Sequence, residues 1–126
     1  MAELNCAVVA WDFSRAASRA LADAMPILEA AKQVRVVIFS NEKDIEDLST
    51  KDLERHLNSH GVKGNFDVIN AESQPIGTAI SSYVTSCQAD LLVMGAFGHS
   101  RTMEFVLGGA TRSILKAPPV PVFLSY

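Results

Sequence analysis

Two kinds of hydrophobic pattern alternate along the chain. Five short, mainly apolar runs predict β-strands, because they are shorter than typical helices and several are rich in Val, Ile and Phe. They cover Asn5–Trp11, Val34–Phe39, Phe66–Ala71, Asp90–Gly95 and Val120–Ser125. Between them, apolar residues recur at steps of three and four, the period of one helix face. These stretches predict helices over Ser14–Lys32, Ile45–His60, a segment opened by Pro75, and Gly109–Lys116.

Individual residues refine the ends of these elements. Asp12 or Ser14 can cap the first helix, and Gly61 closes the second. Pro26 is expected to kink the first helix or loosen one of its turns without abolishing it.

The strict alternation of strand and helix predicts an α/β fold, a single doubly wound parallel sheet. Asp90–Gly95 is apolar at nearly every position, which suits a central strand covered on both faces. Three prolines confine the last strand to an edge of the sheet, because proline cannot donate to a ladder. They are Pro118, Pro119 and Pro121.

Composition narrows the class of protein. The 126 residues fit one domain, and 48% apolar with 20% charged residues is typical of a globular protein. A net charge of −3 without a basic run gives no reason to expect nucleic acid, and no apolar run is long enough to span a membrane. The amino-terminal residues do not resemble a signal peptide. Cys6 and Cys87 lie in apolar segments, so we expect small buried hydrophobes in a reduced cytoplasm.

Ligands of such sheets bind outside the carboxyl ends of the strands, near the switch in strand order. The candidate loops are therefore Trp11–Ser14, Ser40–Asp44, Ala71–Pro75 and Ala96–Gly108. No P-loop, dinucleotide fingerprint, flavodoxin phosphate loop, receiver aspartate or nucleophile elbow occurs in the sequence. His56 and His60 are four residues apart, but the sequence offers no Glu between them and no third ligand nearby, so we interpret them as a solvated helix face and expect no metal.

Four of the seven glycines gather in one segment. Gly95 and Gly98 would let backbone N–H groups approach an anion, and Gly108 and Gly109 stand where a helix with free N–H groups begins. The segment is either a phosphate cradle or a turn and helix start that need glycine for close packing.

The stretch LLVMGAFGHSRTMEFVLGGATRSILKAPPVPVFL closely resembles the carboxyl-terminal signature of the universal stress protein family. Nucleotide binders of that family carry G-x-x-G, nine residues, then G-[ST], and Gly95, Gly98 and Gly108 match in residue and spacing. VVAWDFS resembles the family's first strand, which ends in an aspartate, usually as D-G-S. Asp12 and Ser14 match that motif, whereas Phe13 replaces its glycine.

The resemblance implies one universal stress protein domain over residues 1–126. Its fold would be adenine nucleotide alpha hydrolase-like, a five-stranded parallel sheet in the order 3-2-1-4-5. It also implies ATP with magnesium as ligand, and a homodimer paired through Val120–Leu124. An apolar edge strand favours such pairing on physical grounds as well, because its outer backbone groups lack partners. In nucleotide-binding members the aspartate lies near the nucleoside and the glycines hold the ribose and phosphates.

One position departs from the family pattern. Gly109 stands where Ser or Thr would bind phosphate, and one lost bond to a charged group is worth roughly 1.5–3 kcal/mol, about tenfold to a hundredfold in affinity. His99, Arg101 and Thr111 are placed to compensate, whereas Glu104 adds a carboxylate. EFVLGGATR also resembles the second domains of tandem universal stress proteins. The predicted nucleotide-binding residues are Asp12, Gly95, Gly98, His99, Gly108, Gly109 and Thr111.

Three functions remain open at this point. The first is a regulatory module that binds ATP or a related nucleotide. The second is a dimeric interaction module without nucleotide, favoured by Gly109 and Glu104. The third is an enzyme with at most slow ATP hydrolysis, for which His99 is the only obvious proton shuttle. We assign no catalytic residue.

Overall fold

The computed structural model describes residues 4–11, 15–40, 47–70, 76–95, 114 and 116–125. Strands and helices alternate through most of this part of the chain, as the hydrophobic pattern predicts. The strands are β1 Cys6–Trp11, β2 Gln33–Ser40, β3 Gly64–Asn70, β4 Leu91–Gly95 and β5 Val122–Ser125. The helices are α1 Arg15–Ala30, α2 Asp47–Ser59 and α3 Ile76–Ser86.

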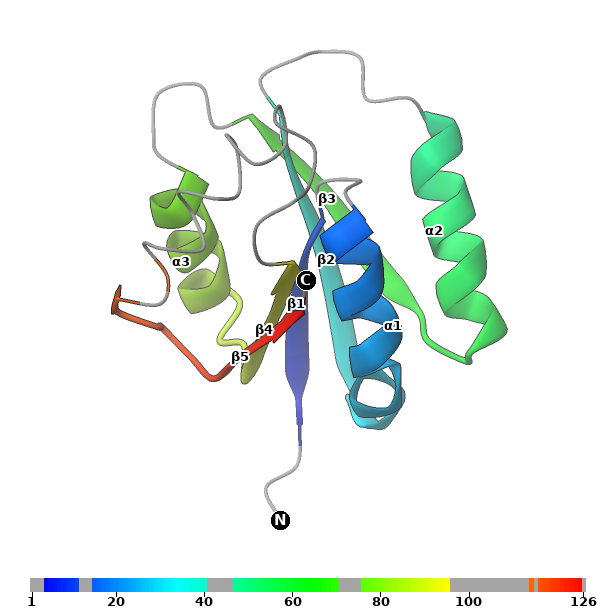
Figure 1. Cartoon of the computed structure of the whole chain (residues 1–126), viewed down its shortest axis with the longest axis horizontal. Coiled ribbons are helices and arrows are strands. Elements are labelled where there is room, and N and C mark those ends of the chain that lie inside the picture. Colours follow the sequence, from blue (N-terminus) through cyan, green and yellow to red (C-terminus); the bar gives the residue numbers. More distant parts are fainter. Residues whose placement is uncertain are drawn as a thin grey trace.

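The five strands form one sheet in the order β3-β2-β1-β4-β5, and every neighbouring pair is parallel. Helices α1 and α2 cover one face and α3 covers the other (Figure 1). The predicted doubly wound sheet, its strand order and the edge position of the last strand are therefore confirmed. The predicted element ends agree with the structure to within about two residues.

The central strands are buried on both faces, and alternate residues supply two separate cores. In β1, Ala7 and Val9 join the core beneath α1 and α2, whereas Val8 and Ala10 join the core beneath α3. β4 is buried at all five positions, as its apolar run predicts. Because side chains of a strand alternate between faces, this two-sided burial requires an almost continuous apolar sequence.

The helix ends follow local chemistry. α1 runs through Pro26 as one element, so the prediction that this proline does not abolish the helix is confirmed. The turn that closes α2 has Gly61 at φ +75°, where Gly61 N–H donates to the Asn58 carbonyl and Val62 N–H donates to the Leu57 carbonyl. This pair of bonds is a Schellman motif with glycine at the left-handed position, as the sequence predicts.

The last predicted helix, Gly109–Lys116, lies mostly outside the described residues. Ile114 and Lys116 are helical, and Ile114 is buried in the core beneath α3. Packing against the sheet therefore includes a residue from this final segment.

Candidate functional site

The carboxyl ends of β1 and β4 lie side by side at the switch in strand order. β1 is flanked by β2 on one side and β4 on the other, with Ala10 opposite Met94 and Trp11 opposite Ile38. The next residues along the ladder, Trp11 and Gly95, are thus neighbours at the last position of each strand. The chain continues from β1 into α1 on one face, whereas Ile114, beyond β4, packs beneath α3 on the other face. Doubly wound folds bind ligands outside the carboxyl ends of the strands at such a switch point.

Only one of the seven predicted site residues belongs to the described part of the chain. Gly95 is the last residue of β4, is buried, and pairs with Ser125 of β5. The other six lie outside the described residues, although Asp12 directly follows β1 and Gly98 is three residues beyond β4. They are Asp12, Gly98, His99, Gly108, Gly109 and Thr111. Their assignment to the site remains a prediction.

A polar cluster that the sequence analysis missed lies beneath α3. The Tyr83 hydroxyl donates to Asp67 of β3, and Arg35 of β2 lies 3.6 Å from the same carboxylate. Burial and then the hydrogen bond to Asp67 raise the pKa of the Tyr83 phenol. The hydrogen bond to Tyr83 in turn raises the pKa of Arg35. The phenol thus stays protonated and the guanidinium charged, which suits a structural tie between helix and sheet.

Both cysteines are free thiols, and they differ in burial. Cys6 is 4% exposed, as predicted, whereas Cys87 is half-buried at the end of α3 and packs against the same core. Burial, and then the nearby Cys87, raises the pKa of the Cys6 thiol. A thiol with a raised pKa is a weak nucleophile, so Cys6 is suited to packing.

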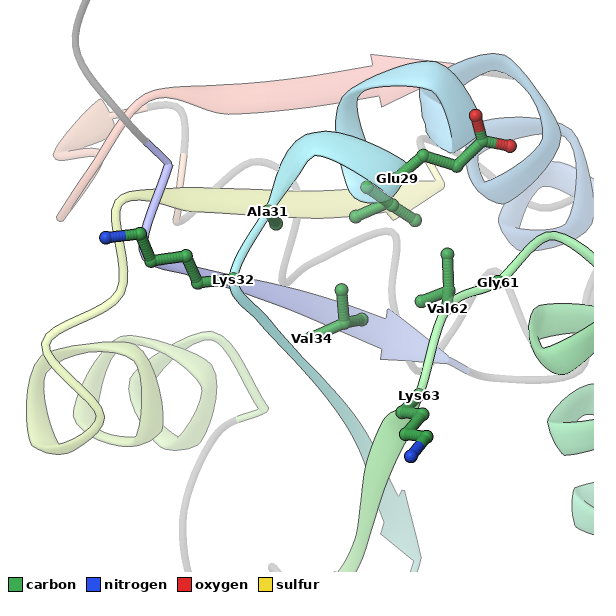
Figure 2. Close-up of a pocket in the computed structure, with 8 residues that line it drawn as sticks. Glu29, Ala31, Lys32, Val34, Gly61, Val62 and Lys63 are labelled. Carbon is green, nitrogen blue, oxygen red and sulfur yellow. The ribbon is translucent and has the colours of Figure 1, made fainter.

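A shallow cavity of about 220 Å³ lies at the amino-terminal end of the strands, between the end of α1, the start of β2 and the α2–β3 turn. Its apolar floor includes Leu28, Val34 and Val62, each 4% exposed or less. Figure 2 shows the side chains of Lys32 and Lys63 directed away from Val34 and Val62. None of the predicted nucleotide-binding residues lines this cavity.

The described residues offer neither a cluster of metal ligands nor a membrane-spanning helix. No group of three or more His, Cys, Asp or Glu side chains there converges in a way that could hold a metal ion. No helix of the described chain is long and apolar enough to cross a membrane.

The strand order, with β1 and β4 adjacent, defines a doubly wound α/β protein. The model of the universal stress protein family matches residues 7–125, and the chain belongs to that family. No curated protein sequence matches the chain.

Solved structures share the fold at low sequence identity. The universal stress protein UspA from Lactobacillus plantarum is 14% identical, with a TM-score of 0.80 over 100% of both chains. A universal stress protein in complex with cAMP is 19% identical, with a TM-score of 0.76 over 99% of this chain and 98% of that one. A universal stress protein from Archaeoglobus fulgidus in complex with dAMP is 20% identical, with a TM-score of 0.69 over 100% of both.

Proposed function

We propose that this chain is a regulatory module that binds an adenine nucleotide at the carboxyl ends of β1 and β4. The observation that carries the proposal is the register of these two strands. It pairs Ala10 with Met94, the residues just before Trp11 and Gly95, so the segments that begin with Asp12 and with the G-x-x-G motif leave from adjacent points at the carboxyl end of the sheet. Fold relatives in complex with cAMP and dAMP support a nucleotide as the ligand class.

The phosphate count follows from the departure at Gly109. Without a hydroxyl at this position, a triphosphate loses one bond that Ser or Thr would supply. We therefore expect AMP or cAMP to bind about as well as ATP with magnesium. Gly109→Ser should raise the affinity for ATP by about tenfold or more and leave that for AMP nearly unchanged.

The chain offers a convenient reporter of binding. Trp11 is its single tryptophan and is the last residue of β1, directly before Asp12. Titration of AMP, cAMP and ATP with magnesium should change Trp11 fluorescence and release heat in calorimetry. Asp12→Ala and Gly98→Val should each weaken binding at least tenfold. Lys63→Ala, at the amino-terminal end of the strands, should leave binding unchanged. The absence of heat and of a fluorescence change at millimolar nucleotide would contradict the proposal.

The second candidate is an interaction module without nucleotide, which Gly109 and Glu104 favour. Nucleotide released from the purified protein on denaturation would contradict this alternative. Slow ATP hydrolysis is tested by His99→Ala. Unchanged turnover in that variant would exclude His99, the only proton shuttle that the sequence suggests, from a catalytic role.

We also propose a homodimer of whole-chain domains, residues 1–126, through the segment Val120–Leu124. Leu92 N–H donates to the Pro121 carbonyl, and Leu92 is opposite Val122. In a parallel ladder this register turns the backbone groups of Val122 away from β4, toward the outer edge. Val122→Pro should therefore abolish the dimer and spare the β4–β5 ladder. Light scattering at tens of micromolar would report a dimer for the wild type, and a wild-type monomer would refute the assignment.

A further inference from the structure

His56 and His60 stand on the same side of α2 and of the turn that follows it. The centres of their rings are 5.1 Å apart. Both side chains are exposed, so solvent and solutes reach them. The sequence interval of four residues brings side chains together on a helix surface, and two imidazoles so placed can chelate one ion.

The tertiary structure adds a group from another helix. Glu29, near the end of α1, places its Oε2 3.2 Å from Nδ1 of His60. Figure 2 shows the Glu29 carboxylate directed away from the apolar floor formed by Val34 and Val62. When Nδ1 of His60 donates to this carboxylate, Nε2 of the same ring carries the lone pair. A carboxylate that orients a histidine in this way is the usual outer partner of a metal-bound imidazole.

The separation of the rings matches a chelate quantitatively. A Zn–N bond of about 2.0–2.1 Å, plus roughly 1.1 Å from nitrogen to ring centre, puts each ring centre about 3.2 Å from the metal. At the tetrahedral angle, two such centres are about 5.2 Å apart. The observed centres are 5.1 Å apart with the ring planes inclined at 66°, in an edge-to-face arrangement. The centres are therefore at chelating distance, and rotation of the two exposed imidazoles would bring one nitrogen of each onto a shared ion.

The electrostatic setting also suits a cation. His60 directly follows α2, and Glu29 is one residue from the end of α1, so both groups lie near negative ends of helix dipoles. Arg55, the nearest cation in sequence to His56, is 3.8 Å from Asp52. The Glu29 carboxylate supplies a negative charge next to His60.

We propose that His56 and His60 form a surface site for one borderline divalent transition-metal ion such as Zn²⁺. The two imidazoles are its protein ligands, Glu29 orients His60 through Nδ1, and water fills the other positions. Borderline ions prefer imidazole nitrogen, whereas Mg²⁺ prefers oxygen, so this site is separate from any magnesium carried by a nucleotide. Two ligands are half of a structural zinc set, and half of the binding free energy of such a set corresponds to a dissociation constant on the order of 1–200 µM.

Calorimetry of the untagged full chain with ZnCl₂ tests the site. His56→Ala and His60→Ala should each weaken zinc binding at least tenfold, and Glu29→Gln by about tenfold or more. His99→Ala, which removes the third histidine of the chain, and Cys87→Ser, which removes the more accessible thiol, should leave the affinity unchanged. MgCl₂ should release no heat of binding in the absence of nucleotide.

A second measurement uses the wild type alone. NMR of imidazole nitrogens during the zinc titration should shift the signals of His56 and His60 and leave His99 in place. The proposal is overturned if zinc binding is not saturable below about 1 mM, or if both histidine variants bind zinc as the wild type does. It is equally overturned if zinc shifts His99 and leaves His56 and His60 unmoved.

Discussion

The end of α3 carries a residue in a backbone conformation that favours glycine. Gln88 has φ +54°, and it is the only non-glycine residue with positive φ in the described part of the chain. Gln88 N–H donates to the Thr85 carbonyl and Ala89 N–H donates to the Val84 carbonyl, the same bonding pattern that closes α2 at Gly61. The two helix ends therefore share one motif, with glutamine at the left-handed position of one and glycine at that of the other.

The comparison of these two helix ends sets the size of the stability change expected for Gln88→Gly. A side chain in the left-handed region costs roughly 1–2 kcal/mol, and the added freedom of glycine in the unfolded chain offsets about 0.4–1 kcal/mol of that gain. The Gln88 side chain is exposed, so its removal takes little packing away. We expect Gln88→Gly to raise the free energy of unfolding by about 0.5–1 kcal/mol, or Tm by about 2–4 °C for a chain of this size.

The matched control is Gly61→Ala at the other helix end. A Cβ at Gly61 would meet no atom within 4 Å, so any loss of stability comes from φ +75° alone. We expect a loss of about 0.5–1 kcal/mol. Urea unfolding followed by circular dichroism measures both variants, with Gln88→Ala to separate loss of the side chain from relief of the backbone. If Gln88→Gly is no more stable than Gln88→Ala, or if Gly61→Ala is as stable as the wild type, backbone strain does not govern these helix ends.

Three further variants test the packing and the pH dependence. Tyr83→Phe removes a phenol whose folded-state pKa is raised above the ordinary 10.0. The wild type should therefore lose stability as pH rises through 10, because the unfolded state releases the proton first. When urea unfolding is compared at pH 8 and 10.5, the variant should lose less stability than the wild type. Asp90→Ala removes the Oδ2 that accepts from Asn5 N–H at 2.8 Å and from Cys6 N–H at 3.2 Å. The free energy of unfolding should fall by about 1 kcal/mol, and that of Asp90→Asn should stay closer to the wild type. Equal stability of Asp90→Ala and the wild type would contradict the role of these hydrogen bonds. Leu57→Ala empties a fully buried position and should cost about 2–5 kcal/mol in the same assay, and a loss below 1 kcal/mol would contradict its core role.

The strands and their arrangement were predictable because two-sided burial leaves a direct trace in the sequence. A central parallel strand needs apolar residues at every position, as β4 has. Among helix ends closed by a left-handed residue, the one that uses glycine was predictable. Gly61 was foreseen as the end of α2, but Gln88 carries no comparable signal, since its left-handed conformation is imposed by the packing of Val84 and Ala89 into one core.

Side-chain pairs between distant segments were not predictable in the same way. Arg35 appeared only as one polar position in an apolar run, and its partners Asp67 and Tyr83 come from a strand and a helix much further along the chain. Likewise, the sequence gives no sign of the carboxylate that orients His60, because Glu29 comes from another helix. For the nucleotide site, the reverse holds. The motif is legible in the sequence, and the structure contributes chiefly the neighbouring ends of β1 and β4.

The central place of β1 in the sheet determines when the sheet can be completed during synthesis. A ribosome delivers β1, β2 and β3 first, and these are three contiguous strands of the five-stranded sheet. The other flank of β1 stays open until β4 emerges, so the nascent chain exposes the inner edge of its own first strand through much of synthesis. The ladder between β1 and β4 is therefore the seam at which the strands made first and the strands made last are joined. Any ligand held there would bind only after translation of β4 and would then fasten that seam.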